Sequence, residues 1–494
     1  MFDLIQQRAM IRPQAIALDS PEISLDYATL VRAVARLAGQ LRAQRVSRLG
    51  LLMDNHPAWA VVDLASQLAG ITLIPIPPFF SPQQIEHTLE DAQIDHLLVD
   101  DHDLLKWQGS STELLSVADL TLALVQINPA GEPMSEVSTI TYTSGTTGHP
   151  KGVCLTQKNL HRVAAALAGA LAVNSDDHHL CLLPLAVLLE NVGGLYAPLL
   201  SGGRVTIPPL KMCGIQGAAG LDVAQMYQTI CQVEPTSLIL LPQMLQALVS
   251  YLEMGHRVPD SLRFIAVGGA PVSDTLLTRA AALDLPVYEG YGLSECGSVV
   301  ALNTPQSHSL GSVGKPLPHI QLRFSDEGEI FIRGNLFAGY LNQPEQTQQW
   351  YASGDLGYLD QQGFLHLTGR KKNIFITAFG RNVAPEWVER ELTIHPAIAQ
   401  AAVFGEAQPF NVALLVPRGE QSHAEIERAV AWANQRLPDY AQIREWLCVS
   451  APFSISNQQL TATGRLRREA IWQQYQTTIE SYYQTAGAVS KEAS

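Results

Sequence analysis

Short apolar segments alternate with amphipathic segments along the first three hundred residues, and this alternation limits the possible folds more than any other feature. Short, mostly apolar runs, LGLLM at residues 49–53, IDHLLV at 94–99 and RFIAV at 263–267, have the length of buried strands. Between such runs, apolar side chains recur at helical spacing, for example over residues 27–41. Strands separated by helices usually pair in parallel and are covered on both faces. The pattern therefore predicts an α/β fold of layered αβ sheets.

The pattern changes after about residue 321. Residues 321–334 and 357–370 each consist of two short strand signals around a central glycine, which predicts a β-rich subdomain built from hairpins. A mixed run of helix and strand signals follows, and it predicts a small α+β unit at the C-terminal end.

Charge and cysteine usage restrict the class of function. The chain has 32 basic and 46 acidic residues, a formal net charge of −14, which argues against a nucleic-acid partner. Its six cysteines are widely spaced with no C-x-x-C pair, which disfavours a zinc site or a disulfide framework and favours a reducing compartment. The longest apolar stretch, near residues 180–189, contains Pro184 and is too short for a transmembrane segment. We predict a cytoplasmic location.

The strongest local motif is TITYTSGTTGHPKG at residues 139–152. A β-rich run leads into glycines, hydroxyl side chains and a lysine, which together present backbone N–H groups and an ammonium to phosphate oxygens. The Walker pattern does not fit, because Gly152 stands where a Ser or Thr would bind magnesium. A flexible surface turn is the alternative interpretation. The candidate phosphate-binding residues are Thr143, Ser144, Gly145, Thr146, Thr147, Gly148 and Lys151.

Three further segments carry polar groups at predicted turns. Residues 287–296 place Tyr291 near Glu295, an aromatic ring suited to stack on a base and a carboxylate suited to bind Mg²⁺ beside phosphates. Asp355 follows a glycine at a strand end, where a carboxylate can accept both hydroxyls of a ribose. Residues 461–470 form a basic turn before the last helix. Taken singly, these segments are explained better by a buried tyrosine and a solvated glutamate, an ordinary turn aspartate, and a solvated basic helix start.

Together and in this order, the four segments resemble those of the adenylate-forming superfamily, which includes acyl- and aryl-CoA synthetases, luciferases and the adenylation domains of peptide synthetases. The resemblance covers about residues 6–468. It implies a large N-terminal domain and a small mobile C-terminal lid, with the hinge at Lys372, two residues after Arg370. The expected domains are residues 1–371, the adenylate-forming core, and residues 372–494, the lid.

The resemblance also implies roles for individual residues. Ser294 contacts phosphate, Glu295 holds Mg²⁺, and Asp355 and Arg370 bind the ribose. Gly380 lines the pantetheine tunnel after the lid rotates. The adenine lies against the Tyr291 ring and the residues of one turn, so that the expected nucleotide site also includes Gly269, Ala270, Pro271 and Gly292. The acyl pocket that the resemblance implies includes Val187, Asn191 and Gly268.

Two positions depart from the family pattern. Val187 stands where a histidine or an aromatic residue commonly follows Pro-Leu-x in the acyl pocket. Arg465 stands where the lid usually carries its catalytic lysine. A guanidinium keeps the positive charge but spreads it over a planar fork. From the sequence alone we therefore expect adenylation at a reduced rate, and we expect Arg465→Lys to accelerate it.

The implied chemistry is a two-step ligation. A carboxylic acid attacks the α-phosphorus of ATP and expels pyrophosphate, and a thiol then displaces AMP from the acyl adenylate. Because two anions meet in the first step, catalysis should consist of positioning and charge neutralisation by Lys151, Arg465 and the Mg²⁺ on Glu295. The thiol belongs to CoA or to the phosphopantetheine of an acyl carrier protein.

The expected acid is a fatty acid, because residues 182–189 and 265–267 are apolar and contain no Asp to pair with an α-ammonium, although Glu190 follows directly. Three alternatives remain: a nucleotide- or acyl-binding relative that has lost adenylation, an amino-acid-activating enzyme, and a P-loop kinase, which the loop pattern disfavours.

Overall fold

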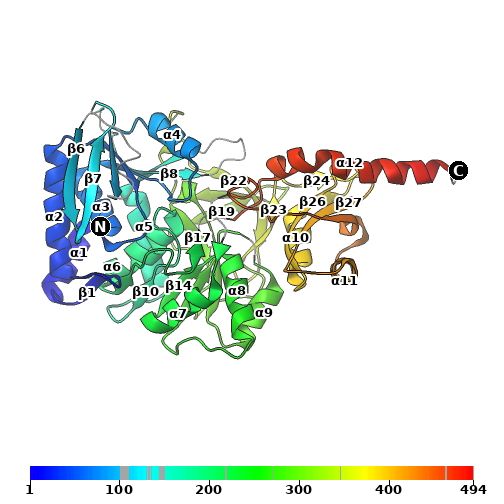
Figure 1. Ribbon diagram of the computed structural model, residues 1–494, viewed down its shortest axis with the longest axis horizontal. Coiled ribbons are helices and arrows are strands. Elements are labelled where there is room, and N and C mark those ends of the chain that lie inside the picture. Colours follow the sequence, from blue (N-terminus) through cyan, green and yellow to red (C-terminus); the bar gives the residue numbers. More distant parts are fainter. Residues whose placement is uncertain are drawn as a thin grey trace.

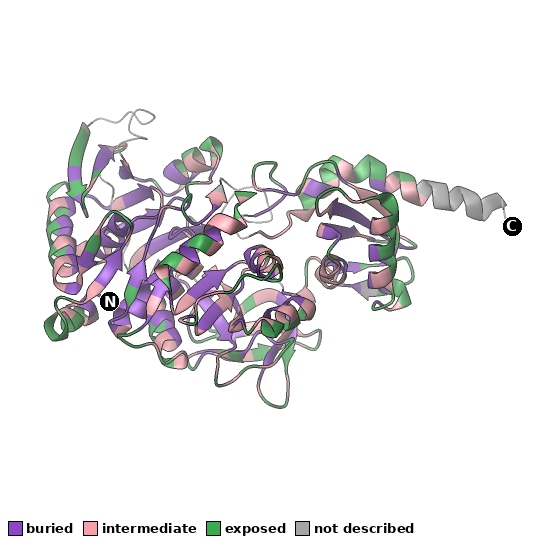
Figure 2. Cartoon of the chain, turned by 60° about the horizontal axis from the view of Figure 1, so that its bottom comes forward, coloured by how far each residue is buried: buried purple, intermediate pink, exposed green. Residues whose placement is uncertain are grey.

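The computed structural model describes residues 1–100, 111–129, 131, 134, 136–143, 151–216, 220–270, 272–344, 346–461 and 464–492. A large N-terminal body and a smaller C-terminal unit lie next to each other along the long axis of the molecule (Figure 1). Buried residues concentrate in the strands of both parts, and the outer faces of the helices are exposed (Figure 2).

Two large sheets form most of the body. In the described residues, one sheet has eight strands in the order β21 (Gly339–Tyr340), β9 (Lys151–Thr156), β8 (Val137–Thr143), β4 (Thr72–Pro75), β3 (Arg48–Leu52), β5 (His96–Asp100), β7 (Leu120–Gln126) and β6 (Ser111–Val117). The other has nine, in the order β18 (Lys315–Pro316), β17 (Ser298–Leu302), β16 (Val287–Leu293), β15 (Phe264–Val267), β14 (Ser237–Leu240), β10 (His178–Leu180), β11 (Arg204–Thr206), β1 (Ile16–Asp19) and β2 (Ser24–Asp26).

The centres of both sheets are parallel. β3 pairs in parallel with β4 and β5, and β14 pairs in parallel with β10 and β15. Helices join and cover these strands, as parallel pairing requires. The predicted α/β fold of layered sheets is therefore confirmed.

The helices of the body form where apolar periodicity and capping residues coincide. In α2 (Tyr27–Ala43) the Asp26 side chain accepts a hydrogen bond from the Thr29 amide at 2.7 Å, and a stripe including Leu30, Val34 and Leu41 is buried. Each buried leucine contributes roughly 2 kcal/mol. The other helices of the body are α1 (Phe2–Ile11), α3 (Pro57–Ala69), α4 (Pro82–Asp91), α5 (Gln157–Ala170), η2 (Glu190–Tyr196), α6 (Ala197–Ser201), α7 (Val223–Val233), α8 (Pro242–Leu252), α9 (Asp274–Ala282) and η3 (Ser294–Cys296).

A four-stranded antiparallel sheet forms the predicted β-rich subdomain. Gly328 and Gly363 turn its two hairpins with φ of 84° and 83°, a region that favours glycine. Pairing in the second hairpin places Asp355 opposite Arg370. The strand order is β19 (Gln321–Phe324), β20 (Glu329–Arg333), β22 (Tyr351–Leu359) and β23 (Leu365–Arg370). A short ribbon of β12 (Ile215–Gln216) and β13 (Gly220–Leu221) lies elsewhere in the body.

The C-terminal unit is the predicted small α+β structure. Its core lies between a three-stranded sheet and two helices, α10 (Pro385–Ile394) and α11 (His423–Asn434). A second apolar cluster packs α12 (Arg468–Glu492) against the same sheet. The strands are β26 (Ile398–Phe404), β27 (Asn411–Pro417) and β28 (Ile443–Cys448), with a separate ribbon of β24 (Phe375–Ile376) and β25 (Asn382–Val383) and a short helix η4 (Asp439–Ala441).

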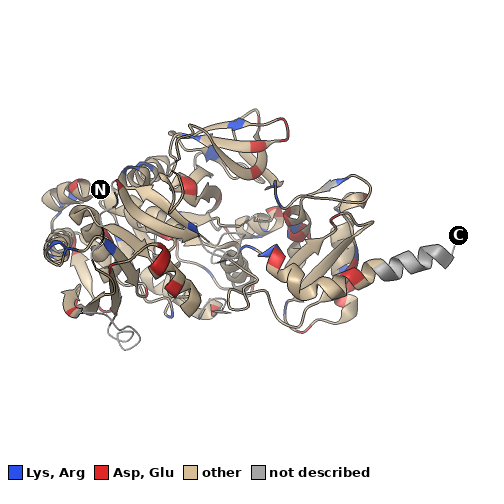
Figure 3. Cartoon of the chain, turned by 90° about the horizontal axis from the view of Figure 1, so that it is seen from above, with Lys and Arg blue, Asp and Glu red and all other residues tan. Residues whose placement is uncertain are grey.

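Acidic and basic residues are interspersed over the body and the C-terminal unit (Figure 3). No helix in the described part of the chain has both the length and the hydropathy needed to cross a bilayer.

Candidate active site

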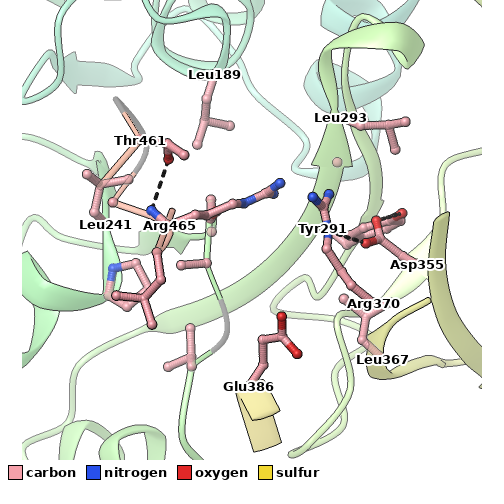
Figure 4. Close-up of a pocket in the computed structure, with 18 of the residues that line it drawn as sticks. Leu189, Leu241, Tyr291, Leu293, Asp355, Leu367, Arg370, Glu386, Thr461 and Arg465 are labelled. Carbon is pink, nitrogen blue, oxygen red and sulfur yellow. Dashed lines mark hydrogen bonds and ion pairs between the residues drawn. The ribbon is translucent and has the colours of Figure 1, made fainter. Parts of the chain in front are cut away.

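A cavity of about 1850 Å³ lies between the body and the C-terminal unit and continues into the body. Side chains from both parts line it, including Lys151 and Glu295 from the body and Arg465 from the C-terminal unit. Figure 4 shows Arg465 together with Tyr291 and Asp355 of the body. The structure thus brings together residues that lie more than three hundred positions apart in the sequence.

One polar group in this cavity is centred on Asp355, which is hydrogen-bonded to Arg370 and Tyr291. Arg370 Nε donates to Asp355 Oδ1 at 2.6 Å, and the Tyr291 hydroxyl donates to Asp355 Oδ2 at 2.7 Å. Burial, and then the negative charge of Asp355, raise the pKa of Tyr291 well above its ordinary value, so the hydroxyl stays protonated and donates. Each carboxylate oxygen can accept a second hydrogen bond. Asp355 is therefore oriented to receive hydroxyl groups, as the expected ribose contact requires.

Glu295 lies near Lys151 in a second polar group. The Tyr340 hydroxyl donates to Glu295 Oε1 at 2.7 Å, and the hydroxyls of Tyr340 and Tyr351 are 3.0 Å apart. Lys151 Nζ lies 5.3 Å from the centre of the Tyr340 ring. Burial, and then Glu295, raise the pKa of Tyr340. A neutral hydroxyl thus orients the carboxylate without cancelling its charge. One carboxylate next to bound phosphates is the donor set that Mg²⁺ commonly uses, so Glu295 fits this ion.

Arg465 reaches the body from the C-terminal unit. Its Nε donates to the backbone carbonyl of Gly269 at 2.7 Å, and its backbone N–H donates to Thr461 Oγ1 at 3.0 Å. The guanidinium extends toward Tyr291 and Arg370 (Figure 4). Burial, and then the charge of Arg370, lower its pKa. This cation therefore lies within the expected nucleotide site.

Of the two residues expected to act when the lid rotates, Lys372 lies in the cavity wall and Gly380 does not. Lys372 lines the cavity, and burial together with the charge of Arg370 lowers its pKa. Gly380 lies in the loop between β24 and β25 with φ of 71° and is exposed, next to the exposed Phe379. Gly380 is not part of the cavity wall in this orientation, so its tunnel role remains a prediction that requires the unit to rotate.

Most of the remaining predicted residues either line the cavity or lie outside the described part of the chain. Thr143, Gly269, Ala270, Gly292 and Ser294 line the cavity, as do Val187 and Gly268 of the expected acyl pocket. Gly292 cannot carry a side chain, because a Cβ would lie 1.7 Å from the Ser298 carbonyl oxygen. Ser144, Gly145, Thr146, Thr147, Gly148 and Pro271 lie outside the described residues.

Asn191 lies elsewhere than the predicted acyl pocket. It is buried but is not part of the cavity wall, and its amide donates to Asp63 Oδ2 at 3.2 Å. The Tyr196 hydroxyl donates to the same oxygen at 2.5 Å. Burial raises the pKa of Asp63 to about 6. Asn191 thus helps to satisfy a buried carboxyl group between α3 and η2, in place of the predicted contact with an acyl chain.

The polar wall residues that the sequence did not predict include Tyr340, Tyr351 and Glu289. Tyr340 and Tyr351 were missed because nothing local connects them with Glu295. Glu289 is buried in β16, and burial raises its pKa to about 8, which leaves it mostly neutral at pH 7. A charged residue inside an apolar strand was the signal for Glu289.

Comparisons with known proteins agree with this geometry. Residues 5–341 match the family model described as "AMP-binding enzyme", and residues 372–487 match that described as "AMP-binding enzyme C-terminal domain". The chain is 28% identical to the long-chain-fatty-acid–CoA ligase FadD15 of Mycobacterium bovis, over 93% of this chain and 91% of that protein. It is 29% identical to the 2-succinylbenzoate–CoA ligase of Bacillus velezensis, over 94% and 96%.

Among solved structures, o-succinylbenzoate CoA synthetase (MenE) from Bacillus subtilis in complex with the acyl-adenylate intermediate OSB-AMP matches with a TM-score of 0.76 and 27% identity, covering 94% of this chain and 97% of that one. The same enzyme has been solved with ATP and a magnesium ion. A double mutant of it bound with the product analogue OSB-NCoA matches with a lower TM-score, 0.62, at the same identity and coverage. The arrangement of this chain therefore resembles the adenylate complex more than the product-analogue complex.

Proposed function

Because the chain belongs to the AMP-binding enzyme family, we propose that it activates a fatty acid as acyl-AMP and transfers the acyl group to the thiol of CoA. The resemblance to adenylate-forming enzymes is confirmed, and the chain is an acid–thiol ligase that uses ATP. The finer points, which are the acid, the acceptor and the role of each residue, form the proposal. All six cysteines are free thiols, which supports the proposed cytoplasmic location.

One observation carries the choice of a fatty acid: the cavity continues along the whole length of strand β14. Its wall includes Leu241 and Gly268, at the carboxyl ends of β14 and β15, and also Ser237 and Phe264, at their opposite ends. At ~3.3 Å per residue, this distance is about 13 Å. The wall also includes Leu167 and Leu171 of the α5 region, so that a long acyl chain would meet apolar side chains along much of its length. We call this part of the cavity the acyl channel.

The charged groups at the acyl channel are already paired. Glu190 is fully buried, accepts from His179 Nε2 at 2.8 Å and from the Leu183 amide at 3.3 Å, and is not part of the channel wall. It is therefore not placed to pair with the α-ammonium of an amino acid, which counts against an amino-acid-activating enzyme. At the far end, Arg263 Nε donates to Asp177 Oδ1 at 2.6 Å. A second carboxylate, such as an aromatic dicarboxylic acid carries, would have to compete with Asp177.

The proposed mechanism uses the polar group around Asp355 and the polar group around Glu295. Arg465 and Lys151 bring positive charge to the carboxylate and the α-phosphate as the two anions meet. Mg²⁺ held by Glu295 would supply further charge neutralisation at the phosphates. Asp355 and Arg370 hold the ribose and so fix the direction from which the acid approaches. The lid then rotates about Lys372 and brings Gly380 to the thiol. A carrier-protein phosphopantetheine presents the same thiol arm as CoA and remains the alternative acceptor.

Gly193 offers a direct test of the acyl channel. It lies on η2 in the channel wall, and a Cβ at this position would be 3.1 Å from Ile239 Cδ1 and 3.9 Å from Leu167 Cδ1. The leucine side chain would occupy space in the channel that a long acyl chain needs. Because overpacking of this kind costs ~1–3 kcal/mol, we expect Gly193→Leu to reduce kcat/KM for long-chain acids about tenfold or more. Short-chain acids should lose much less. Acid-dependent AMP release across a series of chain lengths measures this shift.

The matched control is Gly169→Leu, on the exposed side of α5 with nothing within 4 Å of an added Cβ. It should keep the chain-length profile of the parent. An unchanged profile in Gly193→Leu, or an equal loss for short and long acids, would contradict the assignment of this channel to the acyl chain.

A further inference from the structure

Glu386 has a carboxylate oxygen that lacks a partner inside the active-site cavity. This residue lies in the first turn of α10 and lines the cavity. Its Oε1 accepts from Asn373 Nδ2 and lies 3.6 Å from Arg468 Nη2. Its Oε2 is buried and has no hydrogen-bond partner among the described residues. Figure 4 shows the carboxylate pointing into the space between Arg465 and Arg370.

A buried carboxylate oxygen without a donor is costly, and such atoms usually have a partner that is water or a ligand. The arginines nearby donate to other acceptors, and none of them bonds Glu386 Oε2: Arg370 Nε donates to Asp355, Arg465 Nε donates to Gly269, and Arg468 donates to both oxygens of Glu389 at 2.5–2.6 Å. Three guanidinium groups around the carboxylate disfavour a metal ion there. The group that best fits the position is a neutral hydrogen-bond donor, such as a hydroxyl.

We propose that Glu386 binds the ribose of the nucleotide from the lid side, with Oε2 accepting a hydrogen bond from one ribose hydroxyl. This inference rests on the proposed function and assigns one hydroxyl to each side: Asp355, oriented by Arg370, accepts from the other hydroxyl of the same ribose on the side of the body. The sugar then contacts both parts of the molecule. Nucleotide binding would then favour lid orientations in which Glu386 reaches the ribose, as it does here.

The test compares the binding of ATP, 2′-deoxy-ATP and 3′-deoxy-ATP by calorimetry, with Mg²⁺ and without an acid. Loss of a hydrogen bond to a charged acceptor costs about tenfold in Kd, so the parent should bind each deoxynucleotide about tenfold more weakly than ATP, because one lacks the bond to Glu386 and the other lacks the bond to Asp355. In Glu386→Ala one of these two penalties should fall to about twofold or less while the other stays, and the Kd for ATP itself should rise about tenfold. The matched control is Glu391→Ala on the same helix, a carboxylate 3.9 Å from Arg436, which should keep both of the parent's penalties.

Two results would overturn this inference. If Glu386→Ala keeps both penalties in full, the hydroxyl has another acceptor. If the variant binds ATP and both deoxynucleotides more weakly by the same factor, Glu386 only supports Asn373 and Arg468, and the more conservative Glu386→Gln should then restore binding of all three. Failure of the proposed function gives a different result, because the parent would then form no acyl-CoA from fatty acids while its binding of the three nucleotides could still be compared.

Discussion

Replacing Arg465 by alanine is expected to reduce acyl-adenylate formation ~100-fold or more while the conversion of supplied acyl adenylate to thioester stays within about threefold of the parent. In the proposed mechanism Arg465 is the lid cation at the nucleotide site, and its Nε contact with the Gly269 carbonyl fixes where the guanidinium points. Removing a positioned charge where two anions meet typically costs ~100- to 1000-fold. Acid-dependent exchange of pyrophosphate into ATP measures the first step, and thioester formation from synthetic acyl-AMP measures the second.

The structure changes the expected behaviour of Arg465→Lys. The sequence alone predicts that a lysine accelerates adenylation. A lysine, however, has no Nε–H at the point where the arginine donates to Gly269, so its ammonium would lose this anchor. We now expect the lysine variant to lie between the parent and the alanine variant. An alanine variant as fast as the parent would show that Arg465 takes no part in adenylation. A parent that binds ATP but releases no pyrophosphate with any acid would favour the relative that has lost adenylation.

Replacing Glu295 by glutamine should also reduce adenylation ~100-fold or more, through the loss of the charge that holds Mg²⁺. Folding should be intact or slightly more stable, because glutamine can still accept from Tyr340 and because functional carboxylates often cost stability. The rate should recover partly at high Mg²⁺ if the metal binds more weakly. Pyrophosphate exchange over a Mg²⁺ titration, together with thermal unfolding, tests both statements.

Glu327→Gln is the matched control for Glu295→Gln. Glu327 is an exposed carboxylate, 3.0 Å from Lys371, outside the cavity wall. The control should follow the Mg²⁺ dependence of the parent. Unchanged turnover of Glu295→Gln at limiting Mg²⁺ would show that another acid holds the ion.

The fold was predictable because its signals are local. The helix over residues 27–41 has a capping aspartate and a continuous apolar stripe, and α2 indeed spans Tyr27–Ala43. The hairpins around Gly328 and Gly363 were visible because a turn with positive φ favours glycine. The pair of Asp355 and Arg370 follows from the second hairpin, since the register places the two residues opposite each other.

The parts of the site that were missed depend on long-range contacts. Tyr340 reaches Glu295 because β21 pairs with β9, and no short sequence pattern encodes that pairing. Asn191 follows the apolar stretch that forms part of the channel wall, but η2 directs its side chain toward Asp63 on α3. The contact between Arg465 and Gly269 joins residues 196 positions apart. Such contacts are set by the packing of whole domains, which local propensity does not determine.

Identifying the thioester that the parent protein makes tests the proposed fatty-acid–CoA ligase activity most directly. The protein is supplied with ATP, Mg²⁺ and CoA and with a panel of acids: fatty acids of graded chain length, 2-succinylbenzoate, ferulate and glycine. Mass spectrometry identifies the acyl-CoA, and AMP release is quantified in parallel. If the protein is a fatty-acid–CoA ligase, we expect long-chain acyl-CoA with AMP formed in equal amount, and little product from the aromatic acids or glycine. Faster AMP release with an aromatic acid or glycine than with every fatty acid would contradict the proposed activity.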